Sequence, residues 1–286
     1  VSRFYEFNSE SVGYTKNTVQ GMGLRAGGSV PRSQRRAVTT YSAGGQMDLD
    51  LPTRGLGLLL AHAMGSFPSA TNPTSGVYLY TFTLGNTYGK SFTTQVGAPQ
   101  YGGTVTPKTA TGCKVSSFTL NVANAAIATG SFTIDGAGFT TATSLATPSY
   151  SLNGGVFDFS QGAITVDGSA VANIKDFSIT VDNTLKVDRY NLGAAGAKAE
   201  QGHDGFRAIT GTITAEFTDT TLYTKFLNDT ATGLVLTLTG GTIASTYKDQ
   251  LTITAPAVKF DGDNPVVGGP GVIAVSYTHL RAHETR

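Results

Sequence analysis

A strand followed by a short helix is predicted by the side-chain pattern of residues 207–228. Apolar and polar residues alternate up to residue 217, as they do in a strand with one buried face. Asp219 can then cap a helix, because its carboxylate can accept a hydrogen bond from an N–H of the first turn. The apolar positions are Ile209, Ile213, Ala215 and Phe217 in the strand, and Leu222, Phe226 and Leu227 in the helix. We expect this helix over about residues 219–228.

An earlier stretch, residues 45–61, repeats this order of elements. Its apolar residues are Met47, Leu49 and Leu51 at alternating positions, and then Leu56, Leu59 and Leu60 at helical spacing. Pro52 lies early in the predicted helix, over about residues 52–64, where its missing N–H does no harm. A shift of 166 positions places Gly45 over Gly211, Asp50 over Glu216 and Leu56 over Leu222. The match predicts two related β units in one chain.

Most of the remaining chain also reads as strands, which makes the predicted fold class mainly β. Alternating stretches cover residues 78–84, 91–96, 114–122, 128–134 and 173–182. Residues 140–153 have little charge and contain Pro148, and they form the best domain boundary. The predicted organisation is a first β unit over residues 1–139, a linker over 140–153 and a second β unit over 154–274.

The composition suits a chain whose surface is largely covered by neighbouring copies. Charged residues make up 14% of the 286 positions, against about 25% in an average soluble protein. The net charge of +1 gives no reason to expect nucleic acid or a membrane as an electrostatic partner. Cys113 is the one cysteine, so it cannot form an internal disulfide. No apolar run approaches the ~20 residues of a membrane helix.

Neither end of the chain looks natural. The sequence starts at Val1 with a segment that reads as an ordered strand, so we expect a leading segment to be missing. Residues 275–286 (VSYTHLRAHETR) resemble the translated read-through of a transposase adapter used in sequencing libraries. We therefore leave this tail, with His279 and His283, out of the fold and function. The true final strand is then expected to be cut off near Ala274.

Two loops stand out by their glycine content and charge. Residues 21–36 contain a G-x-G-x-x-A string, but the hydrophobic strand and the helix that a dinucleotide site needs are missing around it. The basic residues of this loop lack interleaved aromatics, which favours a subunit-facing or solvated patch over a nucleic-acid site. Residues 183–205 form the longest irregular segment. Loops of this length inside a domain are usually functional.

Candidate chemistry is sparse. His203 lies beside Asp204, a pair that could orient a general base, but no nucleophile motif accompanies it. His62 reads as an ordinary imidazole near a helix end. Asp48 and Asp50 share one face of a strand and fit an inner wall or solvent face better than a catalytic pair. The sequence predicts no enzyme, no cofactor and no metal site.

The sequence resembles the phage tail tube proteins of long-tailed bacteriophages. The resemblance rests on the order and extent of several strings from residue 1 to about residue 274, rather than on one diagnostic motif. These strings include RFYEFNSESV, GQMDLDLPTRGLGLLLAHAMG, TGCKVSSFTLNV, NIKDFSITVDNTLKVDRYNLG, GFRAITGTITAEFTD and LTITAPAVKFDGDNPVVGGPGVI.

The resemblance implies a β-sandwich or barrel flanked by short helices, in a structural protein of the virion. Copies would close into hexameric or pseudo-hexameric trimeric rings, which stack into the tube through which DNA is ejected. Other expected partners are tail proteins such as a tape measure, and assembly would take place in the host bacterial cytoplasm. Candidate ring-to-ring contacts lie in the two loops: Arg25, Arg32, Arg35, Arg36, Lys186, Arg189, Lys198 and Asp204.

The inner wall of such a tube should carry neutral or acidic groups, because DNA must pass without binding. Polar residues that alternate with apolar ones suit that wall, and the candidates are Asp48, Asp50, Thr214 and Glu216. Two other hypotheses remain open at this point. The chain could be a phage fibre or adhesin-type β-sandwich that binds host glycans, or a hydrolase that uses His203 and Asp204.

Overall fold

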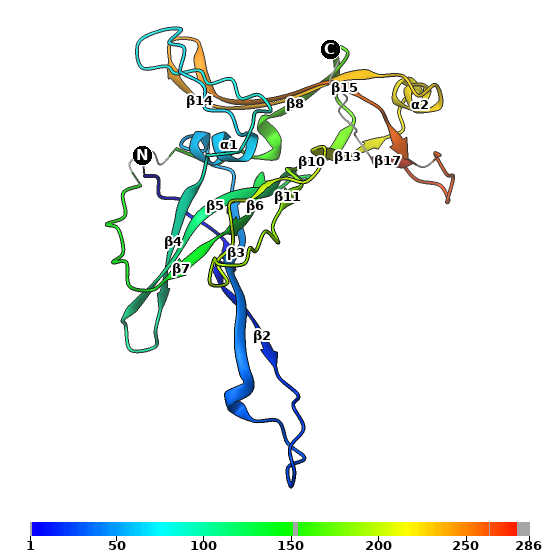
Figure 1. Ribbon diagram of the computed structural model, residues 1–286. Coiled ribbons are helices and arrows are strands. Elements are labelled where there is room, and N and C mark those ends of the chain that lie inside the picture. The colour runs from blue at the N-terminus through cyan, green and yellow to red at the C-terminus, as the bar shows by residue number, and fades with distance from the viewer. Residues whose placement is uncertain (1, 151–153, 263, 279–286) are drawn as a thin grey trace.

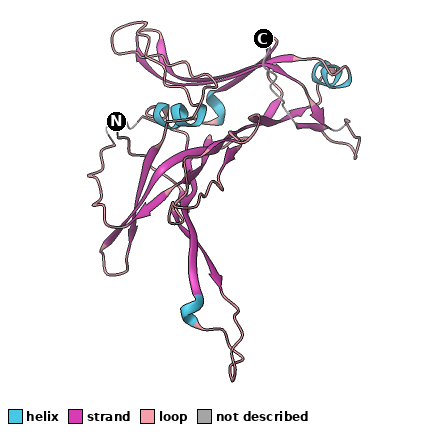
Figure 2. Ribbon diagram, in the orientation of Figure 1, coloured by secondary structure: helices cyan, strands magenta, loops and turns pink. Residues whose placement is uncertain are grey.

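Two β-sheets, stacked as layers, make up most of the molecule. The computed structural model describes residues 2–150, 154–262 and 264–278. Figure 1 shows a large curved sheet with a smaller sheet above it, and Figure 2 shows how little of the described chain is helical. The described strands do not close into a barrel, so the mainly β prediction is confirmed as a layered, sandwich-like arrangement.

The larger sheet, called the main sheet here, has 11 strands. Eight of them follow the order β1-β3-β6-β5-β10-β13-β17-β16, while β2 pairs with β3 and both β4 and β7 pair with β5. Their bounds are β1 Ser9–Glu10, β2 Gly13–Gln20, β3 Arg36–Asp50, β4 Phe92–Pro99, β5 Val105–Val122, β6 Thr129–Gly136, β7 Gly138–Thr140, β10 Ile174–Asp182, β13 Ala208–Glu216, β16 Asp261–Gly262 and β17 Ala274–Thr278.

The smaller sheet covers the apolar face of the main sheet. Its order is β15-β14-β8-β9, with bounds β8 Gly162–Val166, β9 Ser169–Val171, β14 Thr232–Ala244 and β15 Tyr247–Val258. Leu234, Leu236 and Leu238 of β14 are buried in one core cluster with Leu49 of β3 and Ile213 of β13. Each such side chain contributes about 1.5–3 kcal/mol by leaving water. The core therefore joins both halves of the chain.

Two α-helices close the ends of this core. Helix α1 spans Gly57–Met64, later than predicted, and it ends at Gly65, whose φ of 70° suits glycine. A side chain at Gly65 would also approach the Gly85 carbonyl oxygen to 2.6 Å. Helix α2 spans Thr221–Leu227, and the Asp219 carboxylate accepts the Thr221 N–H at 2.7 Å, as the sequence predicts. Short 3-10 helices lie at Ser33–Arg35 and Phe159–Gln161.

The repeat found in the sequence appears in the sheet as two sets of four neighbouring strands. The first set is β1/β2-β3-β6-β5 and the second is β10-β13-β17-β16. In each set the strand related by the shift of 166 positions, β3 or β13, lies second and is followed in the chain by a helix. The pairing of β5 with β10 joins the two sets. Strands from both predicted β units therefore lie in one sheet, and the predicted second unit also supplies the whole of the smaller sheet.

Several expectations need correction. Residues 78–84 alternate like a strand but form none, because Tyr78, Leu79 and Tyr80 stay exposed and only Leu79 makes an isolated bridge. Pro52 makes a bridge to Val156 instead of opening α1. The expected linker is irregular over residues 141–150, and 151–153 lie outside the described residues.

The boundary that we predicted for the adapter-like tail, at residue 275, is four residues too early. Residues 275–278 complete β17, which pairs with β13, and Val275 and Tyr277 are buried in the core. They fit because their alternation matches the apolar face of the sheet. The remaining part of that tail, residues 279–286 with both of its histidines, lies outside the described residues.

Candidate lumen and assembly surfaces

One face of the main sheet is apolar and buried, and the opposite face, called the polar face here, carries two continuous rows of polar side chains. Each residue in a row lies opposite the next in the strand register. The first row is Ser9, Asp48, Ser131, Thr119, Thr180 and Thr210. The second row is Asp50, Thr129, Asn121, Ser178, Thr212 and Thr278. Neither row contains Lys or Arg.

Hydrogen bonds fix the carboxylates of this face. Asp48 accepts from the hydroxyls of Ser131 and Ser9 and from the Gln46 amide, the latter two at 2.7 Å. These bonds, the Ser131 one foremost, hold the pKa of Asp48 below its usual range because they stabilise the ionised form. Asp50 accepts from the side-chain amide of Asn8 at 2.8 Å.

All four residues predicted for an inner wall lie on the polar face. Thr214 pairs with Asp176 and Ser276 on neighbouring strands, and Glu216 forms an ion pair with Lys175 at 2.6 Å. Sequence reasoning missed the hydroxyl residues of β5, β6 and β10, which supply most of the two rows. Their signal was present, since Ser and Thr occupy the alternate positions of those strands too.

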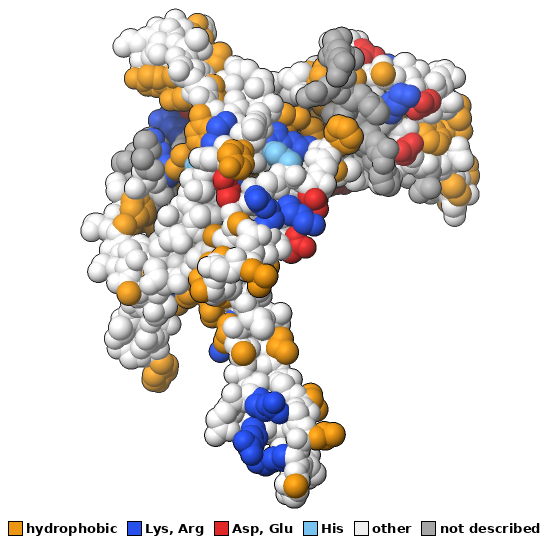
Figure 3. Space-filling view, viewed as in Figure 1, with side chains coloured by type: hydrophobic (Ala, Val, Ile, Leu, Met, Phe, Trp, Pro, Cys, Tyr) orange, Lys and Arg blue, Asp and Glu red, His pale blue; other side chains and the backbone are white. Residues whose placement is uncertain are grey.

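The β2–β3 hairpin projects from the body of the protein as a long arm (Figure 1). Its tip, residues 21–35, holds three of the predicted contact arginines around a shallow hollow, Arg25, Arg32 and Arg35. Figure 3 shows this basic cluster at the end of the arm. Leu24 is fully exposed beside it. No ion pair joins these arginines to an acid in the part of the chain that the structure describes.

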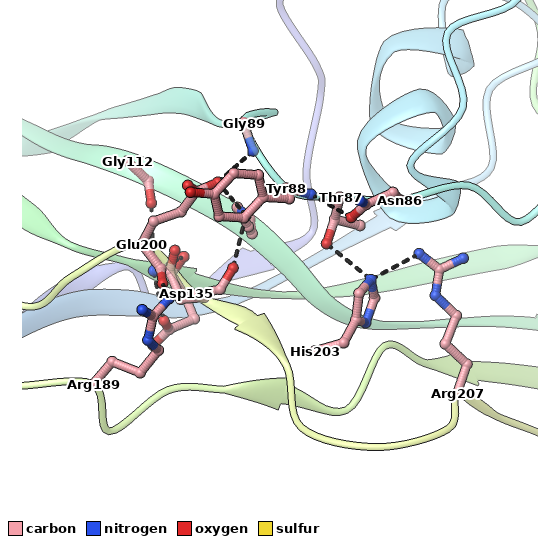
Figure 4. A network of polar contacts seen from close by, with 12 residues as sticks. Asn86, Thr87, Tyr88, Gly89, Gly112, Asp135, Arg189, Glu200, His203 and Arg207 are labelled. Atoms are coloured by element: carbon pink, nitrogen blue, oxygen red, sulfur yellow. Dashed lines mark hydrogen bonds and ion pairs between the residues drawn. The ribbon is translucent and has the colours of Figure 1, made fainter.

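Residues 183–207, called the returning segment here, fold back against the first half of the chain. A small ribbon of β11 (Leu185–Lys186) and β12 (Gly202–His203) closes the segment. Figure 4 shows the polar network that holds it, which includes Glu200 and Asp135. The buried Lys114 ammonium lies 2.6 Å from Glu200 and donates to the Gln201 carbonyl at 2.7 Å.

The predicted contact residues of the returning segment differ in exposure. Lys198 is buried and pairs with Asp135 at 2.6 Å, so its side chain is not on the surface as we expected. Lys186 is half exposed and pairs with both Asp188 and Asp204. Arg189 is exposed and donates to the Glu200 carbonyl.

The histidines do not form the acid–base pair that the sequence left open as one hypothesis. His203 contacts the Thr87 hydroxyl at 3.1 Å and the Asn183 carbonyl at 2.8 Å, while Asp204 faces Lys186 instead of the imidazole. His62 packs between Phe67 and Phe92, and burial lowers its pKa. Within the described ranges, no group of three metal-ligating side chains occurs, and no helix has the length and apolar character to cross a membrane.

A comparison of the chain with models of protein families identifies its family. The model of the family described as phage tail tube protein matches residues 8–278, nearly the whole chain. The chain belongs to the phage tail tube protein family. It is a structural component of the virion tail that assembles with copies of itself and other tail proteins into a tube. A comparison with curated protein sequences gave no match.

Proposed function

We propose that the polar face lines the bore of the tail tube and that a ring of this tail tube protein contains three copies. The observation that carries the proposal is the continuous 11-stranded sheet built from two related strand sets. Each copy would supply two equivalent arcs of the wall, so a trimer gives a pseudo-hexameric ring. The two edges of the sheet, which would expose unpaired backbone groups in a single copy, are then paired by neighbours.

The chemistry of the polar face suits a wall along which DNA slides. Lys and Arg neutralise phosphates and release counterions, and each such contact adds affinity. The two rows across the sheet offer hydroxyls, amides and carboxylates, and the nearby Lys175 is neutralised by Glu216. Asp48 and Asp50 add repulsion between the wall and the phosphates. DNA would therefore pass without specific binding, and a tape-measure protein would fill the same bore before ejection.

The arm is placed to reach the next ring of the stack. It extends beyond the body of the protein and carries Arg25, Arg32 and Arg35 at its tip, and Arg36 follows them directly, opposite Gln20. The exposed members of the returning segment, Lys186, Arg189 and Asp204, are further candidates for this contact. We place assembly of the stack in the host bacterial cytoplasm.

The test is electron microscopy of the purified chain under polymerising conditions, combined with native mass spectrometry. Tubes built from three copies per ring, with the polar face inside, would support the proposal. Six copies per ring, or a bore lined by the smaller sheet, would contradict it. No observation on the described residues favours glycan binding, and His203 has no base–nucleophile partner set that favours hydrolysis.

A further inference from the structure

At one edge of the main sheet, side chains bond the backbone groups that a further strand would otherwise pair with. The Ser11 N–H donates to the Gln46 carbonyl of β3, so the backbone groups of the next residue, Val12, point outward. The outward N–H of Val12 donates to the Glu10 carboxylate at 2.7 Å, and the outward Val12 carbonyl accepts from Lys108 at 3.0 Å. Lys108 and Glu10 also pair with each other at 2.6 Å. This group, called the edge clasp here, covers the backbone at Val12.

The internal repeat shows what the edge clasp covers. Met47 and Ile213 are equivalent by the shift of 166 positions, and they lie opposite Glu10 and Phe177 respectively. Glu10 is therefore equivalent to Phe177, and by the same count Val12 is equivalent to Ile179.

Both of these equivalent residues are buried, which supports the alignment. Val12 is 1% exposed and Ile179 is 5% exposed. Inside the chain Ile179 lies opposite Leu120 of β5, at the junction of the two strand sets. Beside Ile179, the next place in the sheet is filled by strand β5. Beside Val12, the equivalent place is filled by the edge clasp.

The opposite edge of the sheet supplies the matching strand. Phe132 and Tyr277 are equivalent, because they lie opposite Met47 and Ile213. Their own outer partners are Phe118 and Gly262, so these are equivalent too.

Counted four residues on from Phe118 and from Gly262, at which β16 ends, the same alignment sets Val122 against Val266. Val122 is 4% exposed because it pairs with Phe177 of β10, whereas Val266 is 73% exposed and Val267 is 78% exposed. These valines lack, in the described chain, the cover that the internal junction gives to their counterpart.

We propose that the edge at residues 9–12 receives residues 264–267 of a second copy, in the register of the internal β5–β10 junction, and that the edge clasp holds this edge until that strand arrives. The proposal rests on the proposed ring, whose closure it specifies. Val266 would lie opposite Glu10 and Val267 opposite Ser9. Pro265 would lie opposite Ser11, whose N–H points to β3, so the missing proline N–H costs no bond on this side.

The edge clasp protects this edge from pairing with unrelated strands. An exposed edge of a large sheet is a template for aggregation, and charged side chains are a common protection. Here the ion pair is only partly buried, with 23% and 16% of the Lys108 and Glu10 side chains exposed, so an incoming strand can displace it. The strand then supplies the two backbone partners that the side chains provided.

A cysteine pair tests the register. In the full chain with Ser9→Cys and Val267→Cys, oxidation of assembled tubes should convert most subunits into covalent oligomers that end at the trimer. Directly opposite residues of an antiparallel pair have the Cα spacing that a disulfide requires. Cys113 does not compete, because it is buried. The matched control combines Ser9→Cys with Gly268→Cys, which a one-residue offset turns to the other face.

The two proposals fail differently in this experiment. Tubes that form but cross-link no better than the offset control overturn the register while leaving the tube function intact. A chain that forms no rings or tubes, with or without the cysteines, contradicts the proposed function itself. Covalent oligomers that extend past the trimer support the edge pairing and reject the trimeric ring.

The clasp has its own readout. Lys108→Met keeps the length of the side chain and removes the ammonium, and Glu10→Gln removes the charge of its partner. Both should increase the initial rate of polymerisation by roughly tenfold, because a charge-assisted bond no longer competes with the incoming strand. Lys16→Met, on strand β2 and outside the clasp, is the control and should leave the rate unchanged. An unchanged or slower rate in both clasp variants, in protein with a normal unfolding transition, would overturn the protective role.

Discussion

The connection between β2 and β3 and the connection between β10 and β13 occupy equivalent places in the two strand sets, yet they have opposite structures. The first projects into solvent as the arm, and its tip arginines have no acid partner among the described residues. The second folds back as the returning segment, and two of its cations pair with acids: Lys198 with Asp135 and Lys186 with Asp204. Ion pairs with the body hold the returning segment against it, whereas the tip of the arm, without such pairs in the described chain, projects into solvent.

The difference also shows how one topology supports two tasks. The returning segment is held by buried polar groups, which become costly when one partner is missing. Residues 21–35 at the arm tip are all exposed or half-buried, so their sequence can change without disturbing the core. Substitutions in the two connections should therefore change the free energy of unfolding by different amounts.

Removing the acid that holds the returning segment should have the largest effect. Asp135→Ala leaves the buried Lys198 ammonium without its partner and removes the shortest hydrogen bond of the Gln201 side-chain amide, at 2.7 Å. We expect the free energy of unfolding to fall by about 3 kcal/mol, because an unpaired buried charge is strongly unfavourable. Urea denaturation measures it. Lys186→Ala, whose pair is exposed, should change it by less than about 1 kcal/mol. Similar values for both would contradict the contrast.

Loosening the start of the returning segment should have an intermediate effect. The side-chain amide of Asn183 is fully buried and donates to the carbonyls of Ala63 and Val115, each at 2.8 Å. Asn183→Ala should therefore lower the free energy of unfolding by about 2 kcal/mol, since two buried acceptors lose their donor. Thermal unfolding by calorimetry measures the change. Asn191→Ala, at an exposed position of the same segment, serves as the control and should behave like the unmodified chain.

Changing the arm tip should leave folding intact and affect assembly. With Arg25→Glu and Arg32→Glu, we expect less than about 0.5 kcal/mol of change in unfolding free energy. The critical concentration for tube formation should rise by roughly tenfold or more, because the reversed charges no longer complement the surface that receives the arm tip. Sedimentation of polymer measures it, and Arg25→Lys with Arg32→Lys is the charge-preserving control. A destabilised monomer would show that the arm is tied to the body after all.

The smallest expected effect is a pH dependence. The Lys114 ammonium, foremost among its neighbours, lowers the pKa of Glu200 in the folded chain. This contribution to stability is present above the unfolded pKa of about 4.3 and is lost as the pH falls through the lower folded value. In Glu200→Gln, the free energy of unfolding should fall less steeply as the pH is lowered. Urea midpoints measured between the unfolded and the folded pKa of Glu200 follow this change. An unchanged decline would exclude Glu200 as a contributor.

Local patterns in the sequence predicted the repeated strand–helix order, the Asp219 cap and the acidic members of the polar face. Each depends on residues close together in the chain. The sequence could not show that Lys198 meets Asp135, or that Lys114 meets Glu200, because such partners lie far apart in the chain. It also predicted a strand at residues 78–84, although alternation needs a pairing strand, and among the described residues these make only the isolated bridge of Leu79.

The cross-strand rows were missed for a related reason. Ser131, Thr119 and Thr180 look like ordinary strand residues until the register sets them side by side. The edge clasp likewise joins Glu10 to Lys108, whose strand β5 turns from one part of the sheet to another. Long-range register, rather than local propensity, decides both features.

The hydrogen bonds that lower the pKa of Asp48 have a consequence for a virion that waits outside the cell. Acidic surroundings would neutralise an ordinary carboxylate first, and a conduit lined with neutral acid groups would repel its cargo less. Three donors keep the Asp48 charge in place to lower pH. The passage would then stay ready for the genome across the range of acidity that the particle meets.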